Sequence, residues 1–244
     1  MTEPDFGPSL PLRYSEAGTQ FAGVSFAHRT RTAARGAVII APDWRGLSPF
    51  ARAEAARLAN DGFDVAVIDL YGGGLYATVE SEAGPLIRSL IEHRAQGVAR
   101  MTEAVAAFRA AIGTASPIVL IGYSIGGMVS LDFARSGANV AGVALCSALL
   151  KTAEPEASTT VRAPVLVLHG TRDVVSPLST VDALSAEMDA AGNDATFVLY
   201  TGTHHAFYNP DAGTDPNARL VYSPTADARA RAAVDAFIAG VVHP

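Results

Sequence analysis

The sequence has 244 residues, a length that a single α/β sheet commonly reaches, so we expect one domain spanning residues 1–244. Hydrophobic residues make up 49% of the chain and charged residues 17%, which excludes disorder of the whole chain and is typical of a sheet buried on both faces. The net charge of −6, without any run of Lys or Arg, argues against nucleic acid as a partner.

Short apolar runs rich in Val and Ile alternate along the chain with longer segments that carry Ala, Arg and Glu at helical spacing. This alternation predicts an α/β fold with a mostly parallel central sheet and helices on both of its faces. An antiparallel hairpin is expected first, over residues 12–28, and a long irregular segment is expected over 202–224. The expected strands cover residues 21–27, 37–42, 64–69, 118–123, 140–145, 164–169 and 195–200. The expected helices cover residues 50–60, 84–93, 97–112, 126–135, 178–191 and 226–241.

The first residues are acidic and lack the basic start and apolar stretch of a signal peptide, and no apolar run approaches the roughly 20 residues that a membrane span needs. We therefore expect a cytoplasmic protein without membrane contact. The single cysteine, Cys146, lies in an apolar run, which excludes an intrachain disulfide and a cysteine zinc site. A small buried side chain is the simplest interpretation of this residue.

The motif Gly-x-Ser-x-Gly stands at residues 122–126, between an expected strand and an expected helix. In that setting the serine occupies a sharp turn that lifts its hydroxyl above the sheet, and the glycines avoid side-chain collisions in the turn. Ser124 is therefore the candidate nucleophile, and the N–H of Ile125, at the start of the helix, is a candidate oxyanion donor. The alternative is a surface turn without chemistry, which the strand before and the helix after make less favourable.

A serine hydroxyl needs a base to accept its proton and an acid to orient that base. When these groups follow the ends of strands, the chain order is Ser, acid, His. Asp173 follows one expected strand and the pair His204 and His205 follows the next, which fits that order. Taken alone, Asp173 could be a loop or cap aspartate, and strand alternation alone does not choose between the two histidines.

With these positions in place, the sequence resembles the dienelactone hydrolase family of α/β-hydrolases over nearly its whole length. The matching segments cover residues 41–47, 67–72, 122–127, 169–173 and 200–207. The resemblance implies the α/β-hydrolase fold, His205 as the catalytic histidine, and the N–H of Trp44 as the second oxyanion donor. It also implies that Asp43 takes the place of an acidic residue beside the nucleophile, although a carboxylate capping a turn is an equal alternative.

Two departures from the family pattern bear on the substrate. The type enzymes have a cysteine nucleophile where this chain has Ser124, and they bind a substrate carboxylate with two arginines where this chain has Gly73 and Asn209. A neutral ester or lactone is therefore the expected substrate, with Arg45 or Arg88 as alternative sources of positive charge. The candidates for substrate binding or for tuning the site are Asp43, Arg45, Tyr71, Tyr123, His204 and Phe207.

The expected function is hydrolysis of a small carboxylic ester or lactone through an acyl-serine intermediate, without a metal or an organic cofactor. Thioester hydrolysis or acyl transfer on the same three residues is an alternative, because the first half-reaction is shared. A non-catalytic module that binds small molecules is an alternative of another class. A dinucleotide-binding site at residues 71–75 is disfavoured, because the glycines there lack the Gly-x-Gly-x-x-Gly spacing. The oligomeric state has no sequence signal.

Overall fold

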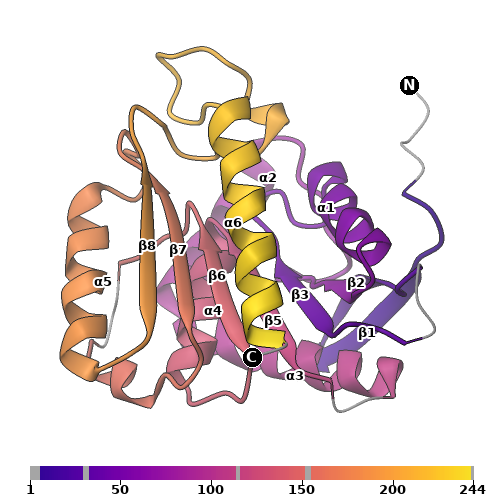
Figure 1. Ribbon diagram of the computed structural model, residues 1–244. Coiled ribbons are helices and arrows are strands. Elements are labelled where there is room, and N and C mark those ends of the chain that lie inside the picture. The colour runs from indigo at the N-terminus through magenta and orange to yellow at the C-terminus, as the bar shows by residue number, and fades with distance from the viewer. Residues whose placement is uncertain (1–5, 30–32, 114–115, 152–154, 243–244) are drawn as a thin grey trace.

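A computed structural model describes residues 6–29, 33–113, 116–151 and 155–242. Eight strands form one sheet in the order β1-β2-β4-β3-β5-β6-β7-β8 (Figure 1). The first two strands form an antiparallel hairpin, β2 pairs antiparallel with β4, and the strands from β4 to β8 run parallel. The strands are β1 (Leu10–Glu16), β2 (Thr19–Phe26), β3 (Ala37–Ala41), β4 (Asp64–Val67), β5 (Ile118–Tyr123), β6 (Gly142–Cys146), β7 (Val165–Gly170) and β8 (Ala195–Tyr200).

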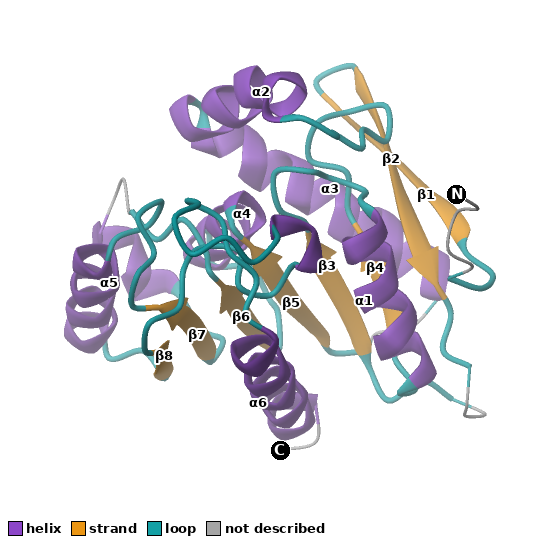
Figure 2. Ribbon diagram, turned by 90° about the horizontal axis from the view of Figure 1, so that it is seen from above, coloured by secondary structure: helices purple, strands orange, loops and turns teal. Residues whose placement is uncertain are grey.

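Helices cover both faces of the sheet (Figure 2). The α-helices are α1 (Pro49–Asn60), α2 (Glu80–Glu92), α3 (Arg94–Ile112), α4 (Ile125–Arg135), α5 (Leu178–Ala191) and α6 (Pro224–Val242), and two short 3-10 helices are η1 (Pro155–Thr160) and η2 (Pro210–Ala212). The side chains of α1 and α6 pack on one face, and those of α3, α4 and α5 pack on the other. In the described part of the chain, no helix has the length and apolarity that crossing a bilayer would require.

The central strands are buried along their whole length, which explains their continuous apolar sequences. Successive side chains of β3 point to opposite faces, so Ile39 packs with α3 and α4 whereas Val38 and Ile40 pack with α1 and α6. The core therefore consists of two apolar layers separated by one sheet. This rigid sheet fixes the positions of the loops that follow its strands.

The structure confirms the mostly parallel sheet, the initial hairpin and the helices on both faces. It differs from the expectation at α2, which begins at Glu80, four residues before the expected start. The side chain of Glu82 reaches back to accept hydrogen bonds from the N–H groups of Thr78 and Val79, so the helix has a cap that lies outside its apolar pattern. The 3-10 helix η1 was not expected from the sequence.

Six adjacent strands, from β4 to β8 in the sheet order, run parallel and end at the same edge of the sheet. The loops that follow β3, β5, β6, β7 and β8 therefore come together above the sheet, as they do in other parallel α/β folds. These loops begin with or contain Asp43, Ser124, Ser147, Asp173 and His205, respectively. All five side chains are buried.

Candidate active site

Ser124 lies in a strained turn between β5 and α4. Its backbone has φ 50° and ψ −115°, a conformation that residues other than glycine rarely adopt and that costs on the order of 1–3 kcal/mol. Glycines make the turn possible, because a Cβ on Gly122 would collide with Gly127 and one on Gly126 would overlap the carbonyl oxygens of Ala41 and Pro42. The turn therefore packs directly against the end of β3.

The backbone around Ser124 provides hydrogen-bond donors for an anion. Ile125 is the first residue of α4, and its N–H lies at the positive end of the helix dipole. Trp44 lies in the loop after β3, the segment on which the turn presses. Among the described residues, neither the N–H of Ile125 nor that of Trp44 donates a hydrogen bond within the chain. Ile125 and Trp44 both line the pocket that contains Ser124, so their N–H groups are the candidates for holding an anion there.

His205 lies between Ser124 and Asp173. The Oγ of Ser124 is 2.9 Å from Nε2 of His205, and Nδ1 of His205 is 2.7 Å from Oδ2 of Asp173. Burial alone would raise the pKa of Asp173, but the hydrogen bond and charge of His205 and the N–H of Ser176 hold it below its usual value. Asp173 is therefore a charged partner for the imidazole, and a proton can pass from Ser124 to His205.

Ser147, for which the sequence alone indicates no role, completes this hydrogen-bond network. Its hydroxyl lies 3.0 Å from Oδ2 of Asp173 and 3.2 Å from Nδ1 of His205. The only sequence signal for it is its place just after a buried strand, where neighbouring strand ends gather. That signal does not distinguish it from other residues that follow strands.

Asp43 is buried near His205, and among the described residues it makes no hydrogen bond to Ser124. Its carboxylate accepts hydrogen bonds from the N–H of Arg45 at 3.0 Å and from the side-chain amide of Asn209 at 3.2 Å. Burial raises the pKa of Asp43 despite these bonds. Burial, followed by the charge of Asp43, also raises the pKa values of Tyr71 and Tyr208. Asn209 therefore holds Asp43 rather than facing a substrate.

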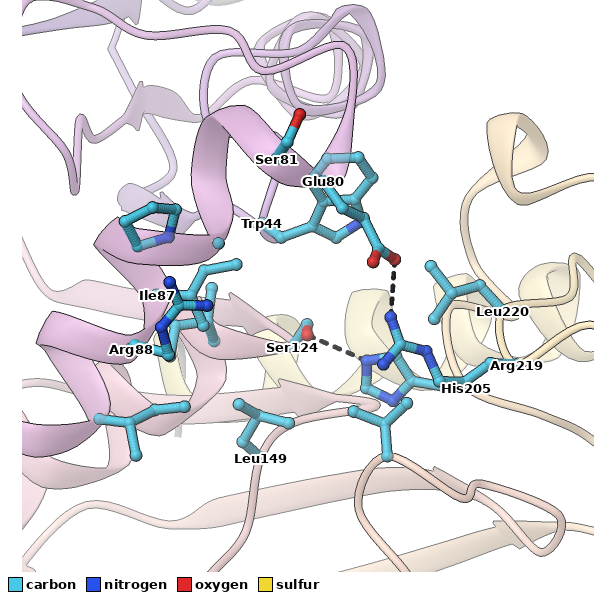
Figure 3. A pocket seen from close by; sticks show the side chains of 15 residues that line it. Trp44, Glu80, Ser81, Ile87, Arg88, Ser124, Leu149, His205, Arg219 and Leu220 are labelled. Carbon is cyan, nitrogen blue, oxygen red and sulfur yellow. Dashed lines mark hydrogen bonds and ion pairs between the residues drawn. The ribbon is translucent and has the colours of Figure 1, made fainter.

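A pocket of about 650 Å³ opens next to Ser124 and His205 (Figure 3). This volume lies within the range of small-molecule sites, roughly 300–1,000 Å³. Most of its wall is apolar, and α2 forms one side of it. The apolar lining consists of Trp44, Pro85, Ile87, Ile91, Ile125, Leu149, Val175 and Leu220.

Charged side chains at this pocket were only partly expected. Arg88, one of the two expected sources of positive charge, lines the pocket, and its guanidinium makes no ion pair or hydrogen bond with the described residues. Arg219 and Glu80 also line it and form an ion pair of 2.6 Å, with both side chains more than half exposed (Figure 3). Because this pair joins residues 139 positions apart in the chain, no local sequence pattern could reveal it.

Several candidates for substrate binding lie outside the lining of this pocket. Arg45 stacks on the ring of Trp44 and forms an ion pair with Asp211. Tyr123 and Phe207 are buried in the apolar layer on the α1 and α6 face. These placements give the two buried aromatic residues core packing, and they give Arg45 a partner other than a substrate.

Tyr71 and His204, two other candidates from the sequence, are likewise not part of the pocket lining. Tyr71 is buried near Asp43, on the opposite apolar layer from Phe207. Nδ1 of His204 lies 3.3 Å from the carbonyl oxygen of Ala218, so its ring faces the irregular segment. Gly73 makes a backbone hydrogen bond to Gln20. Within the described residues, no cluster of three or more His, Cys, Asp or Glu side chains could hold a metal ion.

Comparisons with known proteins show the family and the fold of this chain. The profile of the dienelactone hydrolase family matches residues 24–241. A solved structure named m3DLH superposes with a TM-score of 0.90 at 29% sequence identity, covering 96% of this chain and 98% of its own. The comparison with curated proteins gave no match.

Two more distant structures share the fold. A dienelactone hydrolase-like promiscuous phosphotriesterase from metagenomic libraries has a TM-score of 0.88 at 24% identity, covering 96% of this chain and 98% of its own. A cold-adapted esterase from an Arctic intertidal metagenomic library has a TM-score of 0.67 at 17% identity, with 96% and 92% covered. The sheet order and these superpositions identify the α/β-hydrolase fold, as the sequence predicted.

Proposed function

Because the chain belongs to the dienelactone hydrolase family of ester-hydrolysing enzymes, we propose that it cleaves small, neutral carboxylic esters or lactones through an acyl-serine intermediate. Ser124 is the nucleophile, His205 the general base and Asp173 the acid that orients it. The observation that carries the proposal is the 2.9 Å contact between Oγ of Ser124 and Nε2 of His205, at a strained turn beside an apolar pocket.

In the first half-reaction, Nε2 of His205 takes the hydroxyl proton while Oγ of Ser124 attacks the carbonyl carbon of the ester. Negative charge then develops on the carbonyl oxygen, and the N–H groups of Ile125 and Trp44 donate hydrogen bonds to it. The imidazolium returns its proton to the leaving alcohol oxygen as the carbon–oxygen bond breaks. The products of this half-reaction are the free alcohol and the acyl group on Ser124.

In the second half-reaction, His205 takes a proton from water, and the resulting nucleophile attacks the acyl carbon. The same two N–H groups hold the oxyanion, and the proton passes from His205 to Oγ of Ser124 when the acid leaves. Asp173 keeps Nδ1 of His205 protonated, so that Nε2 is free to act as the base in both steps. For a lactone, the alcohol and the acid are two ends of one product.

The character of the pocket supports a neutral substrate with an apolar body. Its wall is mainly aliphatic and aromatic, and the exposed charges of Glu80 and Arg219 at its side are already paired with each other. Asn209 is engaged by Asp43, and Arg45 by Asp211. Arg88 is then the lining cation that has no partner among the described residues.

The direct test combines covalent labelling with turnover. A fluorophosphonate probe should label the protein at Ser124, and p-nitrophenyl esters of short acids should be hydrolysed. Both signals should vanish in the Ser124→Ala variant. A protein that neither reacts with the probe nor hydrolyses any ester in the panel would contradict the proposal, and faster turnover of acyl-CoA than of the esters would indicate a thioesterase instead.

A further inference from the structure

Ser147 is a buried, strained residue for which neither the sequence pattern nor the family resemblance gives a role. It follows β6 directly, its side chain is fully buried, and its backbone has φ 47°. Its N–H donates to the carbonyl oxygen of Leu168 at 2.9 Å, which ties it to β7. A left-handed conformation at a buried serine is unfavourable, so the fold keeps this hydroxyl in place at a cost.

The hydroxyl of Ser147 contacts three parts of the catalytic network. It donates to Oδ2 of Asp173 at 3.0 Å, lies 3.2 Å from Nδ1 of His205, and accepts from the N–H of Ala206 at 3.4 Å. The hydroxyl has one proton, and the carboxylate is the acceptor-only member of the group, so the proton points to Asp173. One side chain thus links the acid, the imidazole and the backbone that follows the imidazole.

This donor completes the hydrogen bonding of the Asp173 carboxylate. Oδ1 accepts from the N–H groups of Val175 and Ser176 at 2.9 and 2.8 Å. Oδ2 accepts from Ser147 and from Nδ1 of His205. With four donors the buried carboxylate is fully satisfied, and its charge is shared among them instead of being directed at His205 alone.

We propose that Ser147 is a positioning residue for the ester hydrolysis, and that its hydroxyl fixes the Asp173 carboxylate and limits how strongly this carboxylate holds the imidazolium. The inference rests on the proposed function of Ser124, Asp173 and His205. It assigns Ser147 no contact with the substrate, because Ser147 does not line the pocket.

The charge argument gives the direction of the effect. Without the hydroxyl, Oδ2 of Asp173 keeps a single donor, and its negative charge acts more fully on His205. The protonated imidazole is then favoured over a wider pH range, and less of the enzyme carries a free base at a given pH. The acidic limb of the pH profile of kcat/KM therefore moves to higher pH.

Other titratable groups face the same network and remain unchanged by a substitution at Ser147. His169 on β7 has Nε2 3.8 Å from Oδ2 of Asp173, and burial lowers its pKa. Asp43 lies on the loop after β3, and Tyr208 follows the histidine loop. Because these groups are common to all the variants, a difference between the profiles reports on the hydroxyl.

Two substitutions separate the hydroxyl from the backbone. Ser147→Ala removes the hydroxyl and keeps a Cβ in the left-handed conformation, whereas Ser147→Gly removes the hydroxyl and relieves that strain. Ser158→Ala is the matched control, because Ser158 is also a fully buried serine that donates to a carboxylate, that of Glu187, outside the catalytic network. The measurements are the Tm, kcat and KM for a p-nitrophenyl ester, and the pH profile of kcat/KM.

Both Ser147 variants should show an acidic limb moved upward by at most about one pH unit, because the hydroxyl bonds Asp173 in both protonation states of His205 and only the difference between the two states moves the limb. Both should also lose about tenfold or more in kcat with little change in KM. Their Tm values should differ from each other, since only one of them relieves the strain. The Ser158→Ala control should lower the Tm and leave the limb where it is.

An acidic limb that stays in place or moves downward in a folded Ser147 variant would overturn the inference. A loss of kcat that is explained by the fall in Tm alone would overturn it as well. The glycine variant keeps the test decisive if the alanine variant does not fold. Failure of the proposed function has a different signature, since the unchanged protein would then neither react with a fluorophosphonate nor hydrolyse the ester.

Discussion

At the scale of single residues, substitutions of the proposed nucleophile, base and acid should lower kcat by different amounts. Ser124→Ala and His205→Ala should each lower kcat by several powers of ten, since either change removes proton transfer to and from the attacking oxygen. Asp173→Asn should lower kcat by about ten thousand-fold or less, because it misorients the imidazole without removing it. Initial rates with a p-nitrophenyl ester would measure all three.

The neighbouring histidine provides the control for this series. Nδ1 of His204 faces the carbonyl oxygen of Ala218, whereas Nε2 of His205 faces Ser124. His204→Ala should therefore cost much less activity than His205→Ala. Equal losses in the two variants would leave the assignment of the base without support.

The two buried aspartates should give opposite pH dependences of stability. Burial raises the pKa of Asp43, so the folded protein holds its proton more tightly than the unfolded chain does, and stability is lost as the pH rises above the ordinary carboxyl value, about 4. Asp43→Asn removes this titration. The Tm of the variant relative to the parent should therefore become more favourable between pH 4 and pH 8.

Asp173 is the internal comparison, because its pKa is lowered by the hydrogen bond and charge of His205, which outweigh its burial. Its contribution to stability is present above the ordinary carboxyl value and is lost as the pH falls through the lowered value. The Tm of Asp173→Asn relative to the parent should therefore become less favourable as the pH rises from the lowered value to the ordinary carboxyl value, about 4, and should stay level above it. Thermal melts at several pH values measure both variants, and the same sign for the two would contradict this account.

At the scale of elements, the start of α4 is set by contact with the end of β3. A Cβ on Gly126 would overlap the carbonyl oxygens of Ala41 and Pro42, so Gly126→Ala must push the helix away from the loop that holds Trp44. We expect a loss of about 1–3 kcal/mol in the free energy of unfolding, typical of overpacking, together with a fall in kcat. Urea denaturation and ester hydrolysis would measure the two effects.

A second helical glycine separates this contact from helix propensity. Gly240 lies in α6, and a Cβ there would meet no atom within 4 Å. Gly240→Ala should raise the free energy of unfolding by about 0.5–1 kcal/mol and leave kcat unchanged. If Gly126→Ala gave the same gain, the turn at Ser124 would not press on the β3 loop as described.

Much of this architecture could be predicted from the sequence, because buried parallel strands leave continuous apolar runs and the turn at Ser124 needs its glycines. The chain order also brought Ser124, Asp173 and His205 together as expected, while their chemical roles remain predictions. The start of α2 could not be predicted from the apolar pattern, because Glu82 caps the helix from within its first turn. The contact of Ser147 with Asp173 could not be predicted either, because it depends on which strands are neighbours in the sheet.

At the scale of the whole molecule, the charges around the pocket lead to a prediction about the substrate. Asn209 and Arg45 are engaged by Asp43 and Asp211, and Gly73 lies off the pocket. A free carboxylate entering the apolar part of the pocket would lose hydration without charge-assisted hydrogen bonds in return. The methyl ester of a dienelactone carboxylate should therefore have a higher kcat/KM than the free acid at fixed ionic strength.

Arg88, the cation in the pocket lining that has no partner among the described residues, provides a way to test this prediction. Arg88 lines the pocket, and it is the residue that could anchor an anionic substrate there. A preference for the free acid of tenfold or more, about 1.4 kcal/mol, would refute the expected neutral substrate. Loss of that preference in Arg88→Gln would then identify the anchor, whereas the same substitution should barely affect a neutral ester.

The position of α2 has a consequence for how such an enzyme can change over evolutionary time. This one helix forms a large part of the pocket wall, while the loops that follow β3, β5, β6, β7 and β8 hold the groups proposed for the chemistry. Selection acting on α2 can therefore alter which substrates are accepted while the reacting groups stay in place. A mutant library confined to the side chains of α2 that line the pocket should yield new specificities with the same nucleophile, and it offers a short route to redesigning the enzyme.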